Sequence, residues 1–206
     1  MSFFEVMKQR RDVSPNEVTY VCVLKACSNL GDAEKGQEIH SQITRKGLLE
    51  TDDLVGNMLV DMYGRCGSLA EAQVVFDKLL VHDVISWTAL IVGYVKCQSC
   101  EKALNLYKRM QLEGVCPNTV TYICVLKACS SSRTLEKGLE IHAQIDPNML
   151  LRDNAIGNSL MDVYARCGSL ARARQVFHRC HIQDMVSWNI LMVGYADHGY
   201  YEEVLN

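Results

Sequence analysis

A block of eleven residues recurs almost unchanged along this chain. The segment VTYVCVLKACS begins at Val18, and its near copy VTYICVLKACS begins at Val120. Two further blocks return at a similar separation, namely YGRCGSL at Tyr63 as YARCGSL at Tyr164, and VISWTALIVGY at Val84 as MVSWNILMVGY at Met185. Self-similarity of this kind indicates a repeat protein, in which each unit buries its apolar face against its neighbours.

The long cycle contains three related segments of 36, 31 and 35 residues. Each is predicted to form two helices joined by a turn, and units of this size predict an all-α solenoid of stacked antiparallel hairpins. The units are expected at residues 17–52 (long), 53–83 (short), 84–118 (standard), 119–153 (long) and 154–184 (short), with partial standard units at 1–16 and 185–206. With only 3 prolines and no segment of linker composition, the chain is expected to form one continuous array.

Residues that begin and end helices recur at matching places in the units. Apolar residues between Val18 and Leu30 follow the spacing of a one-sided helix, and Gly31 is expected to end it. Asp32 is then expected to cap the second helix, and Gly47 to end it. The later second helices are expected to begin at Ser68, Ser99, Thr134 and Ser169, and Ser68 with Glu71 has the spacing of a capping box.

Charge and hydropathy narrow the functional classes. The formal net charge of -3 argues against a nonspecific polyanion binder, so any nucleic-acid surface must occupy one face. The longest apolar run, Val84 to Tyr94, is far shorter than the roughly 20 residues of a membrane-spanning helix. A soluble protein with no membrane partner is expected. Phe4 and Met7 have the spacing of Tyr107 and Met110, so the start of the chain is interpreted as a second helix and not as a signal or transit peptide.

The 10 cysteines follow the repeat and are not scattered. Three of them recur in the second cycle: Cys22, Cys27 and Cys66 match Cys124, Cys129 and Cys167. A small residue that recurs at helix-packing positions is interpreted as a buried thiol in a reducing compartment. Cys97-Gln-Ser-Cys100 lacks a second closely spaced Cys or His pair, so no metal site and no cofactor are expected.

These motifs resemble the pentatricopeptide repeat family. The segment from Val84 to Asn118 has the aromatic fourth residue of that family, its Ala-Leu pair, its Met and Gly, and its closing Pro-Asn. The alternation of long, short and standard units resembles the plant-type PLS arrangement, with VLKAC and Ile-His in the long units and Cys-Gly-Ser-Leu in the short units. Tetratricopeptide repeats share the hairpin but keep a fixed 34-residue period. The resemblance implies a right-handed superhelix.

The resemblance also implies that the chain binds single-stranded RNA, one base per unit, running parallel to the RNA from 5′ to 3′. The fifth and last residues of each unit would then select the base, because amide and hydroxyl groups can match the edge of an unpaired base. The implied pairs are Asn57 with Asp83 and Asn158 with Asp184 for uracil, Thr88 with Asn118 for adenine, and Asn189 for a pyrimidine. The long units instead have Val21 with Asp52 and Ile123 with Asp153, and an apolar side chain cannot make an amide's hydrogen bonds. The implied target is N-U-A-N-U-Y, where Y is a pyrimidine.

Two further positions are assigned by resemblance. The second residue of each unit would sandwich a base, and it is apolar throughout: Val18, Leu54, Ile85, Val120, Ala155 and Val186. The thirteenth residue would face a phosphate, and it is a cation in Arg65, Lys96 and Arg166 but not in Asn29, Ser131 or Asp197. Because only half of the units supply a cation, modest affinity and strong salt dependence are expected.

Each of these residues also has a purely structural interpretation. Asn57, Asn158 and Asn189 are also compatible with ordinary exposed helix residues, and Val18 and its equivalents with core between units. The three phosphate-facing cations are also compatible with solvated surface charges. His40 and His142 are interpreted as packing or hydrogen-bonding residues.

No nucleophile, base and orienting group form a recognisable set, so the chain is not expected to be an enzyme. The His-x-Glu element of the related editing deaminases is absent. By resemblance, the protein would direct organellar RNA processing or C-to-U editing in a mitochondrion or plastid, with catalysis by another domain or a protein editing factor. The alternative is a protein-interaction scaffold that self-associates through uncapped ends.

Overall fold

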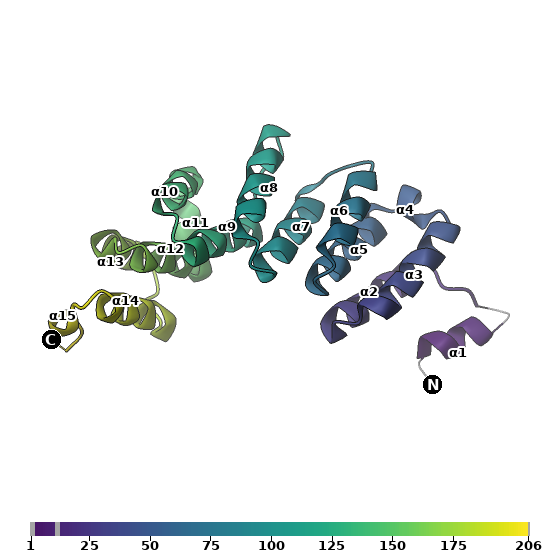
Figure 1. Cartoon of the computed structure of the whole chain (residues 1–206), viewed down its shortest axis with the longest axis horizontal. Helices are drawn as coiled ribbons and strands as arrows, with labels where there is room; N and C mark the ends of the chain where they lie inside the picture. The colour runs from purple at the N-terminus through teal and green to yellow at the C-terminus, as the bar shows by residue number, and fades with distance from the viewer. Residues whose placement is uncertain (1–2, 11–12, 206) are drawn as a thin grey trace. The chain divides into compact units, whose positions relative to one another are not determined.

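The computed structural model describes residues 3–10 and 13–205, and all regular secondary structure in those ranges is helical (Figure 1). This confirms the all-α fold. The chain folds into two compact units, with the boundary between Cys97 and Gln98, inside the repeat that the sequence predicts at 84–118. Each compact unit is described by itself.

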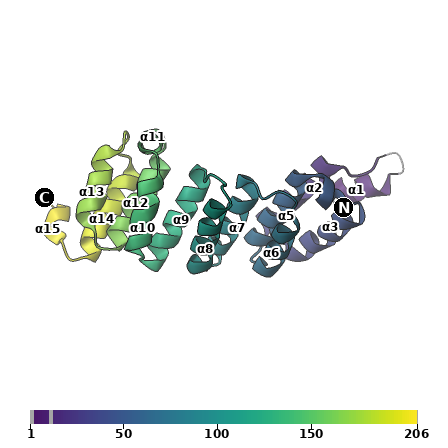
Figure 2. The ribbon, with the colours of Figure 1, turned by 90° about the horizontal axis from the view of Figure 1, so that it is seen from above.

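The first compact unit contains two complete hairpins and three single helices. Its helices are α1 (Phe3–Gln9), α2 (Glu17–Leu30), α3 (Ala33–Arg45), α4 (Leu48–Thr51), α5 (Asp53–Arg65), α6 (Leu69–Lys78) and α7 (Val84–Lys96). Helices α2, α5 and α7 pack side by side as one layer, and α3 and α6 form a second layer against them (Figures 1 and 2). The first helices of successive repeats therefore share one face.

The second compact unit repeats this arrangement. Its helices are α8 (Cys100–Leu112), α9 (Thr119–Ser132), α10 (Leu135–Gln144), α11 (Pro147–Arg152), α12 (Asn154–Arg166), α13 (Leu170–Arg179), α14 (Met185–Asp197) and α15 (Tyr201–Leu205). Here α9, α12 and α14 form the layer of first helices, while α10 and α13 pack against them (Figure 2). In both compact units the hairpins stack as the sequence predicts.

Polar residues before each first helix explain where these helices begin. Asn16 and Asn118 accept a backbone N–H from the third helical residue, and the threonine there bonds back to the asparagine backbone, which completes a capping box. Aspartate carboxylates accept backbone N–H groups at the starts of α5, α7, α12 and α14, where the capping residues are Asp52, Asp83, Asp153 and Asp184. Each cap satisfies amides that the helix itself leaves without acceptors.

Two sequence predictions about helices are wrong. Ser68 lies at the N-cap of α6, but its side chain makes no capping hydrogen bond, so the capping box with Glu71 does not form. The long repeats contain a third, short helix, α4 or α11, where the sequence predicts two helices and a turn. These segments have too few residues for a helical periodicity to be visible in the sequence.

A left-handed residue lies in the turn between the first and second helix of every hairpin. Glycine occupies this position at Gly31, Gly67, Gly168 and Gly199, with φ between 67° and 82° in the left-handed glycines of the chain. Arg133 (φ 51°) occupies it in the hairpin of α9 and α10, and Gln98 (φ 58°) is a second non-glycine residue with left-handed backbone, at the start of the second compact unit. A residue with a Cβ is strained in this conformation by roughly 1–2 kcal/mol, so both residues tolerate backbone strain.

The core runs along the contact between the two layers. Leu24, Ile43 and Trp87 are fully buried in the first compact unit, and Leu126 and Leu160 in the second. All 10 cysteines are free thiols, and burial raises the pKa of Cys129 to about 11. The expected burial is wrong for Cys22, which is exposed because it lies on the open side of α2.

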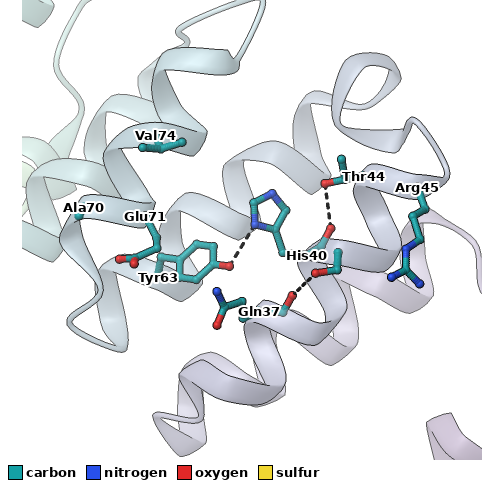
Figure 3. A pocket seen from close by; sticks show the side chains of 9 residues that line it. Gln37, His40, Thr44, Arg45, Tyr63, Ala70, Glu71 and Val74 are labelled. Carbon is teal, nitrogen blue, oxygen red and sulfur yellow. Dashed lines mark hydrogen bonds between the residues drawn. The ribbon is translucent and has the colours of Figure 1, made fainter.

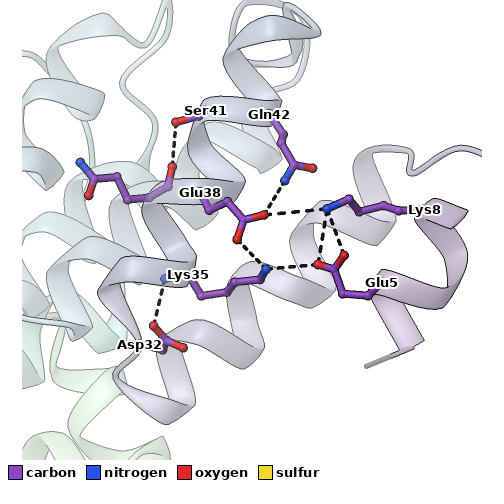
Figure 4. Close-up of polar contacts among 8 residues, drawn as sticks. Glu5, Lys8, Asp32, Lys35, Glu38, Ser41 and Gln42 are labelled. Carbon is purple, nitrogen blue, oxygen red and sulfur yellow. Dashed lines mark hydrogen bonds and ion pairs between the residues drawn. The ribbon is translucent and has the colours of Figure 1, made fainter. Parts of the chain in front are cut away.

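An ion cluster joins α1 to α3 (Figure 4). Lys35 Nζ lies 3.2 Å from Glu5 and 2.6 Å from Glu38, and Lys8 Nζ lies 3.3 Å from Glu5. The hydrogen bonds from Lys35 and Lys8 lower the pKa of Glu5. A network of alternating charges places α1 beside the second layer, although such exposed pairs each contribute little to stability.

Candidate nucleic-acid interface

The second residue of every repeat lies on the open side of its first helix. Val18 is 65% exposed, and the equivalent side chains are exposed as well: Leu54, Ile85, Val120, Ala155 and Val186. The interpretation of these residues as core between units is therefore wrong. Exposing an apolar side chain at the same register in each repeat costs hydration free energy, and a flat apolar ligand group would recover it.

In the first short repeat, the predicted base-selecting residues contact each other. Asn57 is only 4% exposed, and its Nδ2 donates to both Asp83 carboxylate oxygens, at 3.3 and 3.2 Å. Asp83 Oδ1 also accepts from the backbone N–H groups of Ile85 and Ser86 at the start of α7. One carboxylate thus caps a helix and orients the amide on the preceding first helix.

In the second short repeat, the last residue again caps the following helix and interacts with the fifth residue. Asp184 Oδ1 accepts from the backbone N–H of Ser187 at 2.9 Å. That bond, with further hydrogen bonds from the Ser187 hydroxyl and the Asn158 side chain, lowers the pKa of Asp184. Asn158 is half-buried, so its amide is more open to solvent than that of Asn57. The structure therefore brings the fifth and last residues together in both short repeats.

The remaining predicted base-selecting residues are described one by one. Thr88 is buried in the first compact unit, whereas Asn118 caps α9 in the second. Asn189 is exposed on α14. In the long repeats Val21 and Ile123 are half-buried, and their partners Asp52 and Asp153 accept backbone N–H groups at the starts of α5 and α12. Helix capping is therefore sufficient to explain why aspartate occupies these two positions.

Two of the three predicted phosphate-facing cations are held by carboxylates. Arg65 Nε lies 2.8 Å from Asp61, and Arg166 Nε lies 2.8 Å from Asp162, each four residues earlier on the same helix. The hydrogen bond that Arg166 donates to Asp162 raises the pKa of Arg166. The second oxygen of each aspartate accepts from a serine of the preceding long repeat, Ser28 or Ser130. Lys96 is exposed and makes no ion pair within the described ranges.

Comparison with known proteins settles the family. A model of the PPR repeat matches residues 18–48, 57–84, 158–181 and 186–206, and a second PPR repeat family model matches residues 82–131. The chain belongs to the pentatricopeptide repeat family. The sequence resemblance is thus confirmed.

Similar proteins include several pentatricopeptide repeat-containing proteins of Arabidopsis thaliana. One is 41% identical over 94% of this chain and 26% of its own length, and a chloroplastic one is 38% identical over 100% of this chain and 33% of its own. A putative mitochondrial member is 37% identical over 98% and 32%. The chain therefore spans about a quarter to a third of the curated relatives that it matches.

Solved structures share the fold. The pentatricopeptide repeat protein PPR10 in complex with an 18-nucleotide psaJ RNA element matches with a TM-score of 0.82 and 21% identity, over 99% of this chain and 31% of that one. The PPR domain of Arabidopsis thaliana protein-only RNase P 1 in complex with tRNA matches with a TM-score of 0.66 and 16% identity, over 87% and 98%. At these identities the likeness establishes the PPR fold.

The layer of second helices carries a separate recess in the first compact unit (Figure 3). Its volume is about 570 Å³, and Gln37, His40, Thr44, Tyr63 and Glu71 are among the side chains that line it. His40 Nδ1 and the Tyr63 hydroxyl share a hydrogen bond of 3.0 Å. Burial lowers the pKa of His40 and raises the pKa of Tyr63 to about 12. His142 and Tyr164 make the same contact at 2.6 Å, which agrees with a packing role for both histidines.

Other classes of site find no support in the described ranges. No group of three or more His, Cys, Asp or Glu residues there is placed to hold a metal ion. No helix in those ranges has the length and apolar content needed to span a bilayer. Cys97 and Cys100 lie on either side of the boundary between the compact units.

Proposed function

We propose that this chain is a noncatalytic module that binds single-stranded RNA sequence-specifically, one base per repeat, with the target N-U-A-N-U-Y. RNA as the partner is supported by the RNA complexes of two proteins that share its fold. Another domain or a separate protein would supply RNA processing or C-to-U editing. The mitochondrial and chloroplastic relatives support an organelle as the site of action.

The observation that carries the proposal is an unpaired acceptor at Asn57. Because a carboxylate only accepts hydrogen bonds, Asp83 requires the amide to turn Nδ2 toward it. The Asn57 Oδ1 atom is then buried and has no hydrogen-bond partner in the described part of the chain. Leaving a buried acceptor without a donor costs about 1–3 kcal/mol, which a ligand N–H would recover.

Uracil supplies the matching donor. Its pairing edge carries an N–H at the centre, between two carbonyl oxygens, whereas cytosine carries a lone pair at that central position. An acceptor fixed by Asp83 therefore favours uracil over cytosine, a base of nearly the same size. The exposed apolar residues Leu54 and Ile85, at the starts of this helix and the next, would contact the two faces of the base.

The test compares three RNAs that differ only at the two predicted uracil positions, which carry uracil, cytosine or 3-methyluridine. Because 3-methyluridine lacks the central N–H, both replacements are expected to weaken binding, by about tenfold per site at matched low salt. Asn57→Ala with Asn158→Ala should remove the preference for uracil, while Asn105→Ala, an exposed change on α8, should leave it intact. Equal affinity for uracil and 3-methyluridine would refute the base assignment.

A protein-interaction scaffold is the second candidate, because α14 exposes a cluster of apolar side chains. Trp188 is 49% exposed, although its counterpart Trp87 is fully buried, and Met185 and Met192 beside it are exposed as well. Exposed aromatic clusters are typical of protein contacts. Light scattering that detects an oligomer, together with no shift of any of the three RNAs, would favour this second function.

A further inference from the structure

The ninth residue of the repeats differs systematically among the three repeat types. It is Lys25 and Lys127 in the long repeats, Asp61 and Asp162 in the short repeats, and Val92 and Val193 in the standard ones. The lysines belong to the VLKAC block that recurs almost unchanged. A charge that is repeated at one register of one repeat type points to a shared role.

Both lysines are exposed and available to a ligand. Neither Lys25 nor Lys127 makes an ion pair within residues 3–10 and 13–205, whereas Arg65 and Arg166 on the adjacent first helices are each held by an aspartate. Those aspartates accept from a serine as well, so the arginine charge is compensated where it lies. Among the first helices of each long and short pair of repeats, the described cation without a carboxylate partner therefore lies on the long repeat.

The lysines also lie on the appropriate side of their helices. Lys25 follows Val18 by two helical turns and precedes Asn29 by one, which places the three side chains within about 40° around the α2 axis. Lys127 bears the same relation to Val120 and Ser131 on α9. Val18, Asn29, Val120 and Ser131 are all exposed, so each lysine continues a solvent-facing stripe that begins at the proposed base-contacting residue.

We propose that Lys25 and Lys127 bind backbone phosphates of the RNA, in place of the thirteenth residue, which is uncharged in the long repeats. This inference rests on the proposed RNA-binding function and adds a role to repeats whose apolar fifth residues do not select a base. The cation shifts by one helical turn toward the start of the helix, from the thirteenth to the ninth residue. The long repeats then contribute affinity without contributing sequence information.

The experiment measures affinity and its salt dependence for the double variant Lys25→Ala, Lys127→Ala. Each phosphate contact to single-stranded nucleic acid contributes roughly 0.7 to the slope of log affinity against log salt. Loss of two contacts should lower that slope by about 1.4 and weaken binding about three- to tenfold at moderate salt. The loss should be equal for the uracil and cytosine RNAs, because phosphate contacts carry no sequence information.

Two further variants separate this inference from its alternatives. Lys78→Ala with Lys108→Ala removes the same charge from exposed sites on the second helices α6 and α8, and should change the slope little. Arg65→Ala with Arg166→Ala should also have the smaller effect. An unchanged slope for the Lys25 and Lys127 variant, or a larger loss for the arginine variant, would overturn the proposal.

The wild-type chain keeps this test distinct from that of the proposed function. If the wild type binds none of the RNAs, the proposed function fails and the lysine proposal fails with it. If it binds RNA and prefers uracil while the lysine variant behaves like wild type, only the phosphate assignment fails. Circular dichroism on the two lysine variants should show an unchanged thermal midpoint, since their exposed lysines make no ion pairs in the described ranges.

Discussion

At the scale of single residues, helix-capping side chains differ in how much they contribute to the free energy of unfolding. Asn16 accepts the Thr19 backbone N–H at 3.0 Å and belongs to a complete capping box, whereas Ser68 makes no side-chain capping bond. Asn16→Ala is therefore expected to lower the free energy of unfolding by about 1 kcal/mol. Ser68→Ala should change it by no more than about 0.5 kcal/mol. Urea titrations followed by circular dichroism measure both, and equal losses would contradict the assignment of caps.

The sequence pairs the fifth and last residues of each repeat, but it does not predict how the structure holds their side chains. The contact of Asn57 with Asp83 follows from their places in the repeat, but the burial of the Asn57 amide depends on packing between helices and has no local signal. The pairing of Arg65 with Asp61 has a sequence signal, because residues four apart share a helix face. Applying that rule to the short repeats would have identified the compensated arginines.

At the scale of helices, α5 and α7 touch backbone to backbone. A Cβ added at Gly93 would lie 2.8 Å from the Gly64 Cα atom, too close for carbon atoms in contact, while one at Gly64 would lie 3.2 Å from the Gly93 Cα. Gly93→Ala should thus lower the free energy of unfolding by about 1–3 kcal/mol despite the higher helix propensity of alanine. Gly64→Ala should cost less. Calorimetry that shows a raised midpoint for Gly93→Ala would exclude this close contact.

The starts of the helices are easier to predict than their number. The first helices α2, α5, α7, α9, α12 and α14 begin at the first residues of the predicted units, because polar caps precede clear apolar patterns. The short helices α4 and α11 lack such a pattern, and α11 begins with a proline that also suits a turn. The left-handed Arg133 between α9 and α10 shows that the hairpin determines the turn even where glycine is missing.

At the scale of the whole molecule, the repeat period determines which side-chain contacts occur in both compact units. Each compact unit contains one junction between a long and a short repeat, and the two junctions share a serine–aspartate–arginine network and a histidine–tyrosine contact. The division at Cys97 was not predictable, because neither composition nor a linker marks it. Because each compact unit contains one such histidine–tyrosine contact, a change of pH should affect the stability of both units.

The histidines at these junctions should make the stability of the protein depend on pH. Burial lowers the folded-state pKa of His40 and His142 below the ordinary 6.5, with smaller contributions from nearby cations. Above pH 6.5 the neutral form prevails in both states. As the pH falls below 6.5, the unfolded chain binds protons that the folded chain resists, so stability decreases. Asp184, whose pKa is lowered, affects stability only at still lower pH.

Urea midpoints measured between pH 7.5 and 5 should fall for the wild type and change less for His40→Gln with His142→Gln. The exposed His181→Gln serves as the control, and equal slopes for all three proteins would rule out this origin.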